Sequence, residues 1–307
     1  MSEISISIKG LEKSYGSFQA LFGVDLEVMQ GEILGFLGPN GAGKTTTIRC
    51  LLDQIRPQAG EIRVLGLDPQ KNPVQIQRRT GYLPGELRLE GTLKVSAFLR
   101  YLKELRGNQI KEDYLKDLIG RLDLDTSRTI KNLSSGNKQK IGVVQALMHQ
   151  PELLILDEPT SGLDPLIQQE VYQLLREAQS RGATVFFSSH ILGEVETLAD
   201  RVAIIRRGVI VERSTPVKLM DMSMRQVDIR FLEPVDPKPL EDIPGVKLHS
   251  LTPGEQISLQ VEGNLDQLIK TLAQFPVKDL STASHSLEEI FLQYYREENE
   301  QGGSHVR

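Results

Sequence analysis

The sequence predicts an α/β fold: a central parallel sheet, antiparallel strands before it, a helical insertion within it and a small α+β domain after it. Three observations support this class. Residues 32–37 and 153–156 are short, largely apolar stretches, which are typical of parallel strands buried on both faces. The N-terminal segments alternate apolar and polar residues, as half-buried strands do. The pattern changes again after Thr215, where we expect a second domain to begin.

The first predicted elements are antiparallel strands at residues 4–10 (ISISIKG) and 19–28, because both have a period of two. Residues 32–37 (EILGFL) form the next predicted strand, and the glycine-rich segment GPNGAGK follows it. Apolar residues then recur at helical spacing, at Ile48, Leu51, Leu52 and Ile55. The order is therefore strand, glycine-rich loop, helix.

Residues from about 85 to 150 are predicted to form a mainly helical subdomain. Its approximate apolar face is formed by Leu93, Ala97, Leu102 and Leu105. Strands resume at Leu153 and Val185. A helical subdomain thus interrupts the α/β core.

We place the domain boundary between Met220 and Gln226, so that the first domain covers residues 1–220 and the second, an accessory or regulatory α+β domain, covers 226–298. The segments VDIRFL, VKLHSL and ISLQV are predicted strands, and LDQLIKTLAQF and SLEEIFLQYY are predicted helices. Residues 299–307 are expected to be a disordered tail.

Composition excludes several classes of protein. At 307 residues, with 39% hydrophobic and 25% charged residues, the chain has the composition of a globular protein of about two domains. The net charge of −5 gives no general reason to bind nucleic acid. The single cysteine, Cys50, cannot form an internal disulfide and is expected to be a small core residue. No signal segment is visible and no apolar run approaches the ~18 residues of a membrane span, so we expect a cytoplasmic protein.

Residues Gly38 to Thr45 (GPNGAGKT) match the phosphate-loop pattern G-x-x-x-x-G-K-[ST], between a predicted strand and a predicted helix. Glycines let backbone N–H groups surround phosphate oxygens, and the helix N-terminus favours negative charge. Lys44 is expected on the β- and γ-phosphates, and the Thr45 hydroxyl on Mg²⁺. A chance glycine turn is the alternative, which pattern and context together disfavour.

Two carboxylates, Asp157 and Glu158, follow the predicted strand of LLILDEP. The carboxyl end of a parallel strand is where such a fold binds its ligand. We expect Asp157 to hold Mg²⁺, directly or through water, and Glu158 to orient and deprotonate the attacking water. The alternative is an acidic turn with no role in the chemistry.

A second glycine motif, LSSGN at residues 133–137, precedes a segment with Ile141, Val144 and Met148 on one helical face. The motif therefore lies near a helix N-terminus, where Ser134 and backbone donors could meet a phosphate. Ordinary N-capping by Ser134 or Ser135 is the alternative, and the two roles are compatible.

Taken in order, GPNGAGKTT, LSSGN, LILDEP, SGLD and SSH resemble the nucleotide-binding domain of ATP-binding cassette (ABC) proteins over about the first 215 residues. The resemblance implies a phosphate-loop NTPase with a RecA-like core, an antiparallel β subdomain and a helical subdomain. It also implies three groups of ATP-binding residues. The phosphate loop and the start of its helix bind the phosphates through Gly38, Pro39, Asn40, Gly41, Ala42, Gly43, Lys44, Thr45 and Thr46. Tyr15 stacks on adenine, and Ser134, Gly136 and Asp164 act on the ATP of the opposite subunit.

The resemblance further implies that His190 contacts the γ-phosphate and helps to position the water. Tyr15 alone could equally be a core or turn residue, and a lone histidine is more often structural. Asp164 would lie in the loop that contacts the other subunit, although aspartate before proline is also a common turn former.

Two positions depart from the family pattern. The usual signature is LSGGQ, whereas Ser135 and Asn137 occupy its third and fifth positions here. The family also commonly places a glutamine that binds Mg²⁺ after the proline of GYLPGE, where this chain has Gly85. Glu86 could supply an oxygen ligand to the metal after a small shift of the loop.

The expected function is that of an ABC transporter subunit that forms a dimer, expected to be a homodimer, around two ATP molecules. It would hydrolyse them with Mg²⁺ and drive a separate membrane-spanning permease, with export favoured because the C-terminal layout resembles that of drug- and antibiotic-resistance exporters. Such a subunit would lie peripherally on the inner face of the cell membrane. The alternative is a soluble ABC ATPase acting on a ribosome, nucleic acid or protein assembly. It has less support, because only about ninety residues separate Lys44 from Leu133, too few for a long coiled coil, and there is one cassette.

Overall fold

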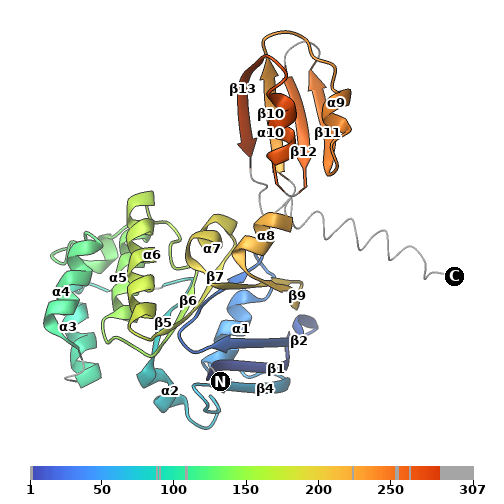
Figure 1. Cartoon of the computed structure of the whole chain (residues 1–307). Helices are drawn as coiled ribbons and strands as arrows, with labels where there is room; N and C mark the ends of the chain where they lie inside the picture. Colours follow the sequence, from blue (N-terminus) through green and yellow to red (C-terminus); the bar gives the residue numbers. More distant parts are fainter. Residues whose placement is uncertain are drawn as a thin grey trace. The chain divides into compact units, whose positions relative to one another are not determined.

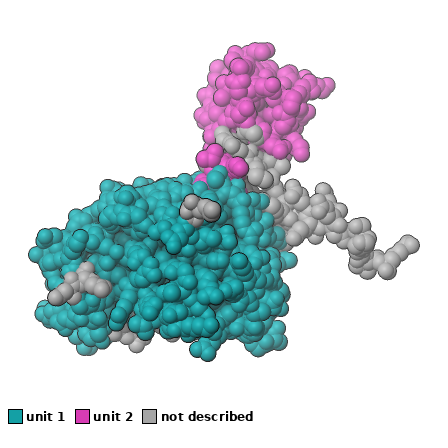
Figure 2. Space-filling model, turned by 60° about the horizontal axis from the view of Figure 1, so that its bottom comes forward, with its two compact units in different colours: residues 1–215 teal, residues 216–307 magenta. Residues whose placement is uncertain are grey.

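The computed structural model describes residues 3–87, 89, 91–107, 110–222, 225–252, 256–262 and 264–283. The chain divides into two compact units, Met1–Thr215 and Pro216–Arg307 (Figure 2). The sequence prediction placed this boundary later, between Met220 and Gln226. The short helix that begins at Pro216 groups with the second unit, so the division coincides with the change of sequence pattern after Thr215.

The first unit contains two sheets. The antiparallel sheet has the order β2-β1-β4, and the larger sheet has the order β5-β6-β7-β3-β8-β9, in which only β9 is antiparallel (Figure 1). The strands are β1 (Ile4–Tyr15), β2 (Phe18–Met29), β3 (Ile33–Leu37), β4 (Ala59–Val64), β5 (Thr80–Leu83), β6 (Leu153–Asp157), β7 (Thr184–Ser189), β8 (Arg201–Arg206) and β9 (Val209–Ser214). The predicted antiparallel start and central parallel sheet are both present.

Within the described residues, the helices of the first unit are α1 (Lys44–Leu51), α2 (Pro73–Arg79), α3 (Val95–Arg106), α4 (Glu112–Arg121), η2 (Ile130–Asn132), α5 (Ser135–Leu147), α6 (Pro165–Ser180) and α7 (Leu192–Leu198). The predicted helix after the glycine-rich loop is α1, which ends at Leu51, so Ile55 lies beyond it. Helix α1 lies between the two sheets (Figure 1). No helix within the described residues is long and apolar enough to cross a membrane.

A continuous apolar core joins the antiparallel sheet, α1 and one face of the parallel sheet. Its members include Ile8, Leu26, Phe36, Ile48, Cys50, Ile155 and Phe186, all nearly inaccessible to solvent. The predicted burial of Cys50 is confirmed, and burial raises the pKa of its thiol to about 11. On the opposite face, a Cβ at Gly35 would lie 2.9 Å from Val195 of α7, so this glycine allows α7 to pack closely on β3. These contacts pack β3 on both faces, and the candidate site follows at the carboxyl end of this strand.

The helical subdomain forms where it was predicted, but its predicted apolar face is wrong. Leu93 and Leu105 are 52% and 65% exposed. The buried positions of α3 are instead Val95 and Leu99, one turn apart, because the helix begins at Val95 and turns this pair towards the subdomain interior. In α5 the predicted face is confirmed, since Ile141, Val144 and Met148 are all buried.

The second unit is a four-stranded antiparallel sheet of order β11-β12-β10-β13 with short helices. Its elements are α8 (Pro216–Met222), β10 (Arg225–Phe231), α9 (Lys238–Glu241), β11 (Val246–Thr252), β12 (Gln256–Val261), α10 (Asp266–Leu272) and β13 (Val277–Ala283). Alternate residues such as Val227, Ile229, Ile257 and Leu259 face a separate apolar core. The predicted helix SLEEIFLQYY and the predicted tail lie outside the described residues.

Candidate nucleotide site

The glycine-rich loop connects β3 to α1 at the carboxyl end of the parallel sheet. Gly41 and Gly43 have φ of 79° and 113°, in the left-handed region that glycine adopts without strain. A Cβ at Gly43 would lie 2.7 Å from Leu21, and one at Gly38 would lie 2.4 Å from the carbonyl oxygen of Ile205. The loop therefore requires glycine both for its turn and for its close packing on neighbouring strands.

Lys44, the first residue of α1, is 5% exposed. Its Nζ donates hydrogen bonds to the carbonyl oxygens of Gly38 (2.7 Å) and Pro39 (3.2 Å), so the side chain folds back across the loop. Burial lowers the pKa of the Lys44 amine, and the negative charges of Glu158 and Asp157 oppose this shift. A buried ammonium beside a loop of backbone donors favours an anionic ligand.

Asp157 ends β6 and is 1% exposed. The Thr45 hydroxyl donates to its Oδ2 at 2.7 Å, and the Ser188 hydroxyl donates to its Oδ1. Asp157 and Ser188 are direct partners in the parallel register of β6 and β7. Thr45 and Asp157 thus place two oxygen ligands of the kind that Mg²⁺ prefers beside the phosphate loop.

Glu158 follows β6 in a left-handed conformation with φ of 51°. For a residue other than glycine, this conformation costs on the order of 1–3 kcal/mol and persists only where surrounding contacts enforce it. Its Oε1 lies 3.1 Å from His190 Nδ1 and 3.7 Å from Lys44 Nζ. The side chain is therefore held between a cation and an imidazole, with 25% of it still exposed.

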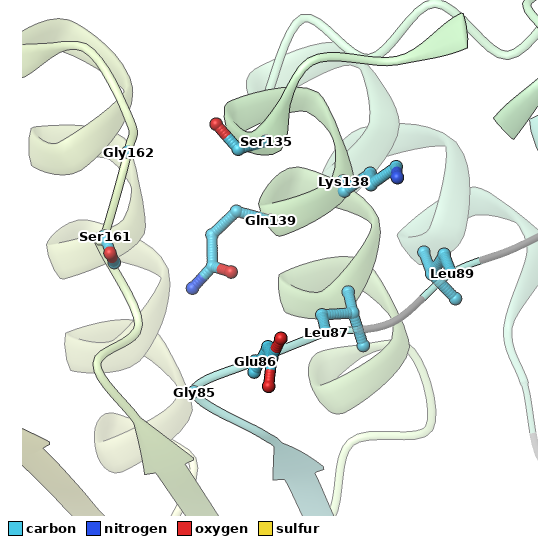
Figure 3. Close-up of a pocket in the computed structure, with 9 residues that line it drawn as sticks. All are labelled: Gly85, Glu86, Leu87, Leu89, Ser135, Lys138, Gln139, Ser161 and Gly162. Carbon is cyan, nitrogen blue, oxygen red and sulfur yellow. The ribbon is translucent and has the colours of Figure 1, made fainter. Parts of the chain in front are cut away.

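Between α5 and the segment after β5 lies a pocket of about 540 Å³ (Figure 3). It is lined by Gly85, Glu86, Leu87, Leu89, Ser135, Lys138, Gln139, Ser161 and Gly162. A Cβ at Gly85 would lie 3.0 Å from Asp157 Oδ2, so the position where relatives are expected to carry glutamine directly adjoins this carboxylate. The Glu86 side chain lines the pocket on the same side as Leu87 (Figure 3).

The LSSGN motif starts α5 as predicted. Ser134 is the N-cap residue, and its Oγ accepts hydrogen bonds from Asn137 N–H (3.3 Å) and from Asn137 Nδ2 (3.0 Å). Ser134 therefore caps α5 in this structure, and its partner in the cap is Asn137, the fifth residue of the motif. Gly136 packs against the loop after β6, because a Cβ there would lie 2.5 Å from Gly162 O.

The contacts described for Asp164 and Tyr15 are with residues outside the Lys44–Glu158–His190 group. Asp164 caps α6 by accepting a hydrogen bond from Ile167 N–H at 3.1 Å, with Pro165 at the first helical position. Tyr15 ends β1 and is 44% exposed, so it is not a core residue, and Lys13 Nζ lies 5.4 Å from the centre of its ring.

Sequence reasoning missed two residues that hold the acidic pair. Ser188 bonds to Asp157, and Gln139 on α5 donates to the carbonyl oxygens of Glu158 and Pro159. Ser188 belongs to the SSH segment, but no periodicity shows which residue of β6 it faces. Gln139 carries no sequence signal, because it lies between the apolar positions of its helix. Within the described residues, no group of three or more His, Cys, Asp or Glu side chains could hold a metal.

Comparison with known proteins agrees with this arrangement. The family model described as ABC transporter matches residues 21–161. Among curated relatives, the bacitracin transport ATP-binding protein BcrA of Bacillus licheniformis is 41% identical over 210 residues, covering 67% of this chain and 68% of that protein. The daunorubicin resistance ATP-binding protein DrrA3 of Streptomyces coeruleorubidus is 36% identical, covering 71% of each chain. The uncharacterized ABC transporter ATP-binding protein YhcH of Bacillus subtilis is 30% identical over 96% of this chain and 97% of its own length.

Solved structures show the same fold. An ATP-binding subunit of an ABC transporter superimposes with a TM-score of 0.64 and 29% identity, covering 70% of this chain and 91% of that one. A dimeric ATP-binding cassette in a post-hydrolysis state, bound to ADP and Pi, has a TM-score of 0.62 at 20% identity, with 69% and 98% covered. The phosphate loop, the acidic end of β6 and the relatives together show that this chain belongs to the ATP-binding proteins of the ABC transporter family.

Proposed function

We propose that this chain hydrolyses ATP as the energy-supplying subunit of an ABC exporter. The observation that carries the proposal is the convergence of Lys44, Glu158 and His190 at the carboxyl end of the parallel sheet, beside the Thr45–Asp157 pair. The names of two relatives, a bacitracin transport and a daunorubicin resistance ATP-binding protein, support a role in export.

ATP would bind with its phosphates in the loop that precedes α1. The backbone N–H groups of the loop and the start of α1 would hold the phosphate oxygens, and Lys44 would exchange its carbonyl partners for the β- and γ-phosphates. Residues Gly38 to Thr46 would form this cradle, with the exposed ring of Tyr15 available for adenine.

Mg²⁺ fits the oxygen atoms of Thr45 and Asp157, which lie 2.7 Å apart, with Glu86 as a further candidate ligand. The bound ion would neutralise charge on the phosphates during transfer. Ser188 holds the other oxygen of Asp157, so the carboxylate keeps its orientation at the end of β6.

Glu158 would accept the proton of the attacking water, and His190 would help to orient that water. The Oε1 atom of Glu158 lies within hydrogen-bonding distance of His190 Nδ1, which donates to it when Nδ1 carries the proton. Lys44 Nζ lies 3.7 Å from the same oxygen, so the carboxylate is held between the two side chains, beside the phosphate loop.

A second copy of the chain would complete the site. Ser134 and Gly136 at the start of α5 and Asp164 at the start of α6 would then face ATP held by the other copy. Loss of the γ-phosphate would remove part of this bridge and allow the copies to separate. This separation would drive a membrane-spanning permease, through which the subunit would be held on the inner face of the cell membrane.

Two measurements test the proposal. Phosphate release per chain should rise with chain concentration, because a monomer holds only part of each site; equal activity of a demonstrated monomer at all concentrations would contradict dimerisation. A tagged full-length chain, recovered from detergent-solubilised membranes of its own cells, should bring a multi-span protein with it. Recovery only of ribosomes, nucleic acid or a soluble assembly would favour the alternative function.

A further inference from the structure

Gln139 is a buried amide in the second turn of α5, 5% exposed to solvent. Its Nε2 donates hydrogen bonds to the carbonyl oxygens of Glu158 (3.0 Å) and Pro159 (3.1 Å). In Figure 3 the side chain extends from the helix towards the segment that carries Ser161 and Gly162. Both donor hydrogens of this amide are thus used on the backbone that follows β6.

Gln139 holds the carbonyl group of Glu158, whose φ of 51° is left-handed. The Glu158 N–H donates to Ser188 O at 3.2 Å and lies 3.1 Å from Ser188 Oγ, while its carbonyl accepts from both Gln139 and Ser161 N–H. Glu158 is therefore fixed from β7 on its amide side and from α5 on its carbonyl side. Contacts on both sides of the residue are of the kind that maintain such an unfavourable conformation.

The first turn of α5 also lies directly on the same segment. No side chain fits at Gly136, because its Cβ would lie 2.5 Å from Gly162 O. Two contacts one turn apart, at Gly136 and at Gln139, therefore join α5 to the segment from Glu158 to Gly162. A shift of the helix must displace the backbone of Glu158 with it.

We propose that Gln139 is a positioning residue for Glu158. Through the hydrogen bonds of Gln139, α5 sets the orientation of the Glu158 carboxylate towards the attacking water. The inference rests on the proposed role of Glu158 as the general base. Because α5 starts with the Ser134–Asn137 segment, which we assign to ATP of the second copy, Gln139 links occupancy of that site to the geometry of hydrolysis in its own chain.

The test is Gln139→Glu in the full-length chain, which keeps the shape of the side chain but replaces its donor group by an acceptor. We expect kcat for phosphate release to fall by up to about 100-fold, because a misplacement of about 1 Å can cost on the order of 10²-fold. ATP affinity, measured with a fluorescent ATP analogue, should stay within about 2-fold, because the hydrogen bonds of Gln139 go to Glu158 and Pro159, which follow β6, and not to the phosphate loop. The matched control is Gln145→Glu on the same helix, which should leave kcat unchanged.

A buried carboxylate facing two carbonyl oxygens could unfold the chain, so Gln139→Met serves as a second variant. It removes the donors without adding charge and should lower kcat by a similar factor. If either variant melts at the wild-type temperature with unchanged kcat, the inference is wrong.

A double-mutant cycle separates positioning from a general structural role. In the Glu158→Gln background, where no base remains to be positioned, Gln139→Met should have no further effect on single-turnover hydrolysis. A full additional loss there would overturn the inference. If Glu158→Gln alone keeps its turnover, the proposed function fails instead, so the two failures are distinguishable.

Discussion

The two units of the chain differ in what they bury. The first unit buries charged and amide side chains such as Lys44, Asp157, Gln139 and Glu194. The described core of the second unit is apolar, built from residues such as Val227, Ile229, Leu259 and Leu268. Burying a charge is costly unless it is paired. The buried charges of the first unit are paired or hydrogen-bonded beside the phosphate loop, whereas the described core of the second unit is held by apolar contacts.

Glu158→Gln should give the largest effect on the chemistry of the first unit. We expect turnover to fall on the order of 10²–10⁴-fold, because the amide cannot accept the proton of water, while ATP affinity is retained. Steady-state phosphate release and titration with a fluorescent ATP analogue measure the two quantities. Near-normal hydrolysis would remove Glu158 from the role of base.

Leu259→Ala should give the largest effect on the second unit. Leu259 is fully buried in β12, and its truncation should lower the free energy of unfolding by about 2–5 kcal/mol. Denaturant unfolding measures this change, and Leu248→Ala, at a position 36% exposed, is the control that should change it less. If the two units are independent, Leu259→Ala leaves ATP affinity unchanged. A large loss of ATP affinity would show that the two units are energetically coupled.

His149 should make the stability of the first unit depend on pH. Burial lowers its pKa to about 4, with a smaller contribution from the charge of Arg106. The unfolded chain protonates this residue near pH 6.5, so stability is complete above that pH and falls as the pH decreases towards 4, by up to about 3 kcal/mol. Urea unfolding at pH 7.5 and pH 5, compared with His149→Gln, isolates this contribution. An equal loss in both proteins would assign it to other groups.

Lys44→Ala should weaken ATP binding. A hydrogen bond to a charged group contributes about 1.5–3 kcal/mol, so affinity should fall roughly 10- to 150-fold. Calorimetric titration with ATP checks this, and Lys138→Ala, outside the phosphate loop, is a control for the lost charge. Unchanged affinity together with unchanged turnover would exclude the assigned loop.

Asp164 should show the smallest effect on stability and separates capping from subunit contact. Asp164→Ala removes the N-cap of α6 and should cost about 1 kcal/mol of unfolding free energy, whereas Asp164→Asn should preserve the cap. Turnover per chain is expected to rise with chain concentration. If this rise is smaller in Asp164→Asn than in the wild type, the carboxylate has a role in the dimer. If the Asn variant behaves as the wild type does, the role of Asp164 is limited to capping α6.

Local patterns predicted the elements better than their orientation. The strand, loop and helix around Gly38–Thr45 form as expected, because glycine freedom and helical spacing are local properties. The prediction of the apolar face of α3 was wrong, since Leu93 lies before the helix and Leu105 faces solvent. Burial there depends on where the helix starts and on what packs against it, and neither is encoded in a single periodicity.

The sequence by itself determined the phosphate loop, the acidic end of β6 and the order of the motifs, because each depends on neighbouring residues. Only the tertiary structure decided that Ser188 faces Asp157, that Glu158 adopts a left-handed conformation and that Gln139 holds its carbonyl. These contacts join residues 19 to 31 positions apart. Their geometry is fixed by strand register and helix packing, which arise only when the whole unit folds.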